Sequence, residues 1–99
     1  MRSRTLSDSA IFVVARDVLA NEFGAEHVLL NLKNGTYYGV EDVGGEIWKM
    51  LQTPVSFGRL CGATAAAFDV DAEMCRRDLH RFVSDLLANG LVEVADGNP

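Results

Sequence analysis

The sequence predicts a single α+β domain in which a three-stranded antiparallel meander is followed by three helices. Short apolar runs separated by Gly and Asn fill residues 11–40, whereas apolar residues recur at helical spacing from residue 43 onward. The 99 residues are 48% hydrophobic and 23% charged, a composition that suits a chain folding around one modest core.

The meander is expected to use strands at residues 18–23, 27–32 and 36–40, with turns at Gly24-Ala25 and Asn34-Gly35. Asn-Gly favours the positive φ angles of a two-residue hairpin turn. Residues 11–14 are a candidate for one extra edge strand. Because residues 36–40 end the meander, one row of their backbone N–H and C=O groups is expected to be unpaired.

The first helix is indicated by a run in which apolar residues recur at i, i+4, i+7 and i+8, namely Val43, Ile47, Met50 and Leu51. Asp42 stands at the expected N-cap, and Gly45 slightly weakens the first turn. Thr53-Pro54 ends the helix, because the residue before a proline avoids the α region.

Two more helices follow, with Ser56 and Asp71 as their N-caps. The second spans about ten residues, and its inward positions are Phe57, Leu60, Cys61, Thr64 and Phe68. The third covers residues 72–88, and its core stripe comprises Cys75, Leu79, Phe82 and Leu86. Asn89-Gly90 is a helix stop signal, and residues 91–94 are predicted to form a short final strand.

Charge and cysteine content limit the classes of partner. Lys and Arg number 9 against 14 Asp and Glu, so the net charge of −5 opposes a large nucleic-acid surface. Two cysteines do not make a disulfide framework, and the apolar run at 11–15 is too short to span a membrane. We expect a cytoplasmic protein without membrane or nucleic-acid partners, with a domain at 11–95 between flexible ends at 1–10 and 96–99.

No catalytic, metal or cofactor signature is found in the sequence. Cys75 and His80 are five residues apart on one predicted helix, about 140° around its axis, so they cannot form a catalytic pair. His27 has no second ligand at metal spacing, and Gly44-Gly45 lacks the lysine of a phosphate loop. The chain is therefore expected to be a binding protein that uses no cofactor, and not an enzyme.

One stretch resembles a known family. The run Val28-Leu29-Leu30-Asn31-Leu32, then Asn34-Gly35-Thr36-Tyr37-Tyr38-Gly39-Val40, then Val43-Gly44, Ile47-Trp48 and Leu51, resembles the PqqD-like family of pyrroloquinoline quinone biosynthesis and related peptide-modification pathways. Gly45 and Met50 depart from the family's habitual wording, where a larger residue and leucine are common. The resemblance extends over residues from about 11 to 94.

The resemblance implies a winged helix-turn-helix-like RiPP recognition element, a domain that binds the leader of a ribosomally made precursor peptide. The leader would lie as an added strand beside the third meander strand, walled by the third helix. The positions implicated are Thr36, Tyr37, Tyr38, Gly39, Val40, Arg76, Leu79, His80, Val83 and Leu87. The implied partner is a separate processing enzyme, with a lasso-peptide leader peptidase preferred over a radical SAM enzyme.

Several alternatives stay open at this point. Tyr37 and Tyr38 point to opposite faces of the sheet, and the sequence does not decide which one is buried. A winged-helix DNA-binding protein, using Arg76, Arg77 and Arg81, is the alternative function. The chain is expected to be a monomer or a weak homodimer, because exposed sheet edges can pair with a second copy.

Overall fold

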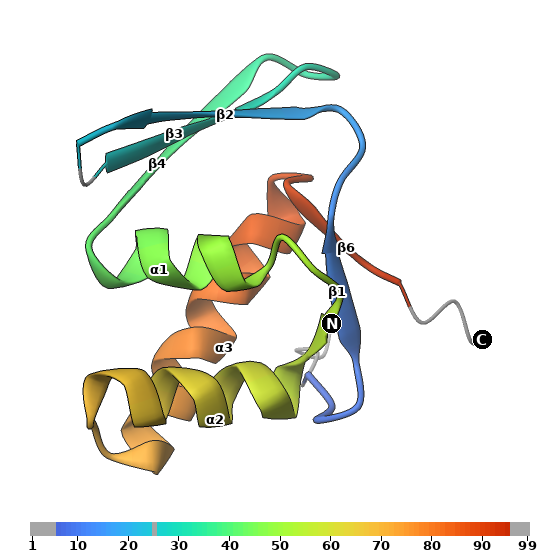
Figure 1. Ribbon diagram of the computed structural model, residues 1–99. Helices are drawn as coiled ribbons and strands as arrows, with labels where there is room; N and C mark the ends of the chain where they lie inside the picture. Colours follow the sequence, from blue (N-terminus) through green and yellow to red (C-terminus); the bar gives the residue numbers. More distant parts are fainter. Residues whose placement is uncertain (1–5, 25, 96–99) are drawn as a thin grey trace.

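The computed structural model describes residues 6–24 and 26–95, and it confirms the α+β class. The elements are β1 (Ile11–Val14), β2 (Val18–Phe23), β3 (Glu26–Asn31), β4 (Thr36–Glu41), α1 (Val43–Met50), β5 (Val55–Ser56), α2 (Phe57–Phe68), α3 (Ala72–Ala88) and β6 (Val92–Val94). They form two small antiparallel sheets and three helices (Figure 1). The predicted turn residue Ala25 lies outside the described residues.

The predicted meander is present as the sheet β2-β3-β4. Its register pairs Leu30 with Tyr37 and ends at the pair Asn31 and Thr36. The turn between β3 and β4 therefore has four residues, 32–35, and the predicted two-residue turn is wrong. Gly35 has a positive φ of 73°, and the side chain of Asn34 instead accepts a hydrogen bond from the Thr36 amide at 2.9 Å.

β1 is the central strand of the second sheet, β5-β1-β6, and not an extra edge of the meander. Just after β1, the Ala15 amide donates a hydrogen bond to the Leu91 carbonyl at 3.0 Å, and the chain then turns into β2. The final strand predicted at 91–94 is present as β6, whereas β5 has only two residues and was not predicted. Figure 1 shows β1 beside the helices, with the meander above α1.

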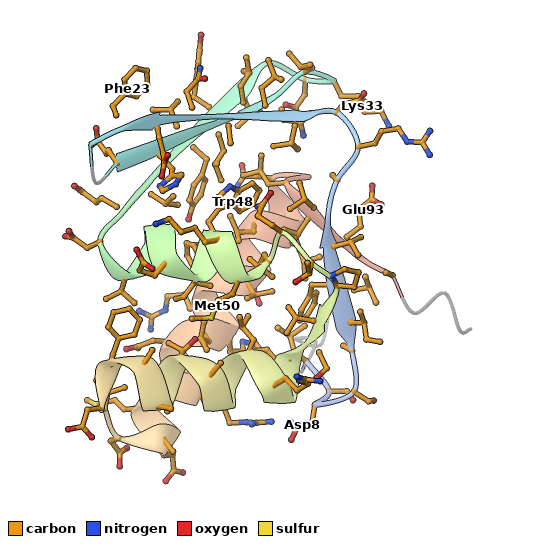
Figure 2. The ribbon with its side chains drawn as sticks, in the orientation of Figure 1. Asp8, Phe23, Lys33, Trp48, Met50 and Glu93 are labelled. Atoms are coloured by element: carbon orange, nitrogen blue, oxygen red, sulfur yellow. The ribbon has the colours of Figure 1, made fainter. Side chains whose placement is uncertain are left out.

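The core lies between the inner face of the meander, the three helices and the second sheet. Trp48 is buried between α1 and the meander (Figure 2). The largest fully buried side chains are Phe12, Phe57, Leu29, Leu51, Leu60, Leu79, Leu86, Leu91, Val83 and Val92. They come from β1, β3 and β6 and from the three helices and their flanks, so one hydrophobic core joins both sheets.

Residues 6–10, part of the segment 1–10 that was predicted to be flexible, contact the helices. Leu6 is buried, and Asp8 accepts a backbone hydrogen bond from Gly58 at 3.0 Å. Asp8 also forms an ion pair with Arg76 of α3. Of the predicted flexible ends, residues 1–5 and 96–99 lie outside the described residues.

The N-terminal ends of the helices match two of the three predicted caps. The Ser56 hydroxyl accepts from the Arg59 amide at 3.2 Å, and Asp71 accepts from the Met74 amide at 2.9 Å. Asp42 occupies the N-cap position of α1, but its side chain makes no capping hydrogen bond. Its backbone has φ 54° and ψ −121°, a conformation that L-residues adopt at a cost.

Candidate functional site

β4 forms one edge of the meander. Among the described residues it is hydrogen-bonded to β3 alone, in the sheet order β2-β3-β4. Neighbouring residues of an antiparallel strand direct their N–H and C=O groups to opposite sides. Half of the backbone groups of Thr36–Glu41 therefore point away from β3, where another strand can pair with them.

The side chains of β4 alternate between the core and solvent. Tyr38 is half-buried and packs on the core, and Val40 is 4% exposed, whereas Tyr37 is 73% exposed. The buried tyrosine is therefore Tyr38. Burial raises the pKa of the Tyr38 hydroxyl, and the neighbouring carboxylate of Asp85 on α3 raises it further. Asp85 thus lies close to the inner face of β4.

A cavity of about 400 Å³ lies where β4 passes into α1. It is lined by Val43, Gly44, Ile47, Thr64, Phe68, Val70, Met74, Cys75, Asp78, Leu79 and Phe82. Apolar side chains dominate this lining, and Asp78 is its single charged residue. The sequence does not predict this cavity, because its walls come from three helices whose packing no local pattern determines.

One flank of α3 faces β4 and the cavity. Phe82 lies against Gly44, at the start of α1, and Asp78 is part of the cavity wall. Asp85 is near Tyr38, as its effect on the tyrosine pKa indicates. Since residues three, four and seven apart share a helix face, Asp78, Phe82 and Asp85 form one continuous surface.

The opposite flank of α3 holds two of the residues that were predicted to line the leader site. Arg76 pairs with Asp8, and its guanidinium lies 5.2 Å from the centre of the Phe57 ring. The His80 Nε2 accepts a hydrogen bond from the Leu6 amide at 3.4 Å. Both side chains therefore contact the N-terminal segment and α2, away from β4.

The apolar members of the predicted set are core residues. Val83 has no exposed surface and Leu79 is 2% exposed, while Leu87 is half-buried against the core. Val83 was predicted to line a surface pocket, and this prediction is wrong because its side chain is fully buried. The buried face of α3 is wider than the predicted core stripe and includes Val83. Leu79 reaches the cavity wall from within the core.

The described residues include no metal cluster, and the two cysteines among them are not activated. No group of three His, Cys, Asp or Glu side chains in residues 6–24 and 26–95 could hold a metal ion. Cys61 and Cys75 are buried free thiols. Burial raises the pKa of Cys61 to about 11 and also raises the pKa of Cys75, so neither is an activated thiolate.

The same part of the chain contains no helix with the length and apolar character needed to cross a bilayer.

Comparison with known proteins agrees with the resemblance found in the sequence. The family model described as coenzyme PQQ synthesis protein D (PqqD) matches residues 26–92. A solved structure, TbiB1 in complex with the TbiA(beta) leader peptide, is similar with a TM-score of 0.74 and 31% sequence identity. The match covers 82% of this chain and 94% of that one. No curated protein matches this sequence.

Proposed function

The chain belongs to the PqqD family, and we propose that it binds the leader segment of a ribosomally made precursor peptide. The observation that carries the proposal is the free edge of β4, within a fold similar to that of a protein solved with a leader peptide. A guest chain would add to Thr36–Glu41 as a further strand. Main-chain hydrogen bonds would supply affinity, and alternate side chains would supply selectivity.

The inner side chains of such a guest strand would face α3. Because Tyr38 and Val40 point inward from β4, guest residues on the same face would meet the flank that carries Asp78, Phe82 and Asp85. These three residues replace Arg76, His80 and Val83 in the proposed site. The predicted strand residues Thr36, Tyr37, Tyr38, Gly39 and Val40 remain in it, because every second one of them directs its backbone groups to the free edge.

We further propose that the protein delivers its peptide to a separate enzyme and does no chemistry itself. Cys61 and Cys75 support this proposal, because both thiols are buried and burial raises the pKa of each. A lasso-peptide leader peptidase is the preferred partner, and a radical SAM enzyme is the second candidate. Copurification of the bound leader with each enzyme would distinguish the two.

No observation favours the alternative of DNA binding through α3. Arg76 is engaged by Asp8, and the exposed face of the helix also carries acidic residues, including Glu73 and Asp78. A protein with a net charge of −5 lacks the cation excess that phosphate binding needs.

The test is calorimetric titration with a synthetic leader taken from the precursor encoded beside the gene, with the core peptide as control. We expect leader binding tighter than about millimolar, equivalent to roughly 4 kcal/mol, and no binding of the core peptide. Absence of leader binding would overturn the proposal.

The binding edge can be located with two proline variants, Gly39→Pro and Val40→Pro. Neighbouring residues send their N–H groups to opposite sides, so one variant removes a donor to β3 and the other removes a donor at the free edge. We expect one variant to keep the meander by NMR and lose leader binding. Gly39→Ala is the matched control, since a methyl group there meets nothing within 4 Å. A folded edge variant that binds normally would place the site elsewhere.

A further inference from the structure

We propose that the cavity at the end of β4 receives one large apolar side chain of the guest peptide, and that Asp78 and Asp85 select a Lys or Arg near it. This inference rests on the proposed leader binding and specifies which residues the leader must carry. It concerns the cavity formed by α1, α2 and α3, which lies beyond the backbone pairing edge itself.

The cavity has the size and chemistry of a binding pocket. Its volume of about 400 Å³ falls in the range of ligand sites. Asp78 provides the only charge in its wall. An apolar guest group therefore fits this site better than water does.

The rim of the cavity is also unusually apolar for a protein surface. Val43, Val70 and Met74 line it, and their exposed fractions are 44%, 48% and 57%. Three exposed large apolar side chains around one opening form a patch of the kind that marks an interaction site. Phe82, half-buried between this patch and the start of α1, extends it toward β4.

The occupant is identified by position and charge. Val43 follows β4 after a single turn residue, so a strand paired along β4 runs directly to the opening. No salt bridge joins Asp78 or Asp85 to a cation among the described residues, although both lie on the flank of α3 that faces the strand. Carboxylates next to an apolar opening favour a guest that combines an apolar anchor with a cationic residue.

Strand geometry determines the spacing between the apolar anchor and the cationic residue of the guest peptide. Asp85 is beside Tyr38, and the cavity begins at Val43, five residues further along the chain. Residues on one face of an extended guest recur at every second position. The apolar anchor and the residue that meets Asp85 should therefore be about four positions apart on the same face of the guest.

The experiment is selection from a display library of random peptides about twelve residues long, which reach roughly 40 Å when extended. Wild-type protein should enrich peptides with a large apolar residue and a Lys or Arg about four positions away. The selected peptide is then titrated against variants. Gly44→Leu and Thr64→Leu fill the cavity from α1 and from α2, and both place a good helix former within a helix.

Each cavity-filling variant should weaken binding about tenfold or more. A peptide with alanine in place of its anchor should bind both variants and wild type equally. Asp85→Asn should weaken the Lys-containing peptide severalfold and leave its Lys→Gln version unchanged, while Glu93→Gln on β6 changes neither. Circular dichroism checks that each variant is folded, and two independent filling variants guard against one that is not.

The outcomes separate this inference from the proposed function. If no peptide is enriched, or if the enriched peptides are insensitive to both proline variants of β4, strand addition itself is wrong. If binding depends on the β4 edge but not on Gly44→Leu, Thr64→Leu or Asp85→Asn, strand addition stands, but the cavity and the carboxylate beside it do not select the peptide.

Discussion

The side-chain amide of Asn31, at the end of β3, donates a hydrogen bond to the backbone carbonyl of Asn89, after α3, at 2.9 Å. The same nitrogen lies 3.3 Å from the Gly90 carbonyl, and the Asn31 oxygen accepts from the Lys33 amide at 2.9 Å. One buried side chain thus joins the meander to the end of α3 and forms part of the β3–β4 turn.

Replacing Asn31 should therefore destabilise the whole domain. We expect Asn31→Ala to lower the free energy of unfolding by about 1–3 kcal/mol, because two carbonyls lose a donor. Asn31→Asp should cost more at neutral pH, because a carboxylate would face those carbonyl oxygens. Urea denaturation measures both. Asn34→Ala removes an exposed turn acceptor and should cost less; an equal loss would contradict the role of Asn31.

Gly90 is expected to tolerate no side chain. Its φ is 70°, and a Cβ atom there would lie 2.6 Å from the Asn31 side-chain nitrogen. Gly35 has a similar φ of 73° with nothing within 4 Å, so Gly35→Ala measures the backbone cost alone, of about 1–2 kcal/mol. Gly90→Ala should cost more than Gly35→Ala.

A double-mutant cycle tests the cause of that excess. In an Asn31→Ala background the extra cost of Gly90→Ala should largely disappear, since the clashing nitrogen is gone. An excess that survives in the double mutant would mean that something other than Asn31 opposes the side chain.

Asp42 should be replaceable with a gain in stability. Its positive φ costs about 1–3 kcal/mol, and its side chain makes no capping bond that would offset this cost. We expect Asp42→Gly to raise the melting temperature, whereas Asp71→Ala, which removes a true cap, should lower the free energy of unfolding by about 1 kcal/mol. A loss of stability in Asp42→Gly would mean that the Asp42 side chain does stabilise the start of α1.

The buried thiols should make the fold sensitive to alkali. The pKa of Cys61 is raised to about 11 by burial and by Cys75, so the folded state holds the proton more tightly than the unfolded state does. Stability from this group is complete below pH 9 and is lost as the pH rises through about 11. Chemical denaturation across this range should show a fall in stability that is reduced in Cys61→Ala.

A thiol reagent at pH 8 should modify native Cys61 and Cys75 slowly; rapid reaction would contradict their burial.

Much of the fold could be predicted because local patterns determine it. Ser56 and Asp71 were correctly identified as caps, and α3 has the predicted bounds of 72–88. These features depend on neighbours a few residues away. β1 was misplaced because its partners are β5 and β6, which lie about 40 and 80 residues further along the chain, and no periodicity within four residues reveals such pairing.

The unpaired edge of β4 could be predicted because residues 36–40 end the meander, whereas the choice between the two flanks of α3 depended on tertiary packing. The N-terminal segment, through Leu6 and Asp8, covers the flank with Arg76 and His80, and that contact spans about seventy residues of sequence. Polar character alone could not distinguish the covered flank from the one beside Tyr38.

The outward direction of Tyr37 has a consequence for any chain that pairs with β4. Such a chain would bury every second side chain against α3 and display the intervening ones beside the exposed ring of Tyr37. One face of the bound peptide would then contact this protein, while the other face would remain accessible to an enzyme. Mutating the peptide residues on this exposed face should therefore slow the processing of the peptide without weakening its binding to this protein.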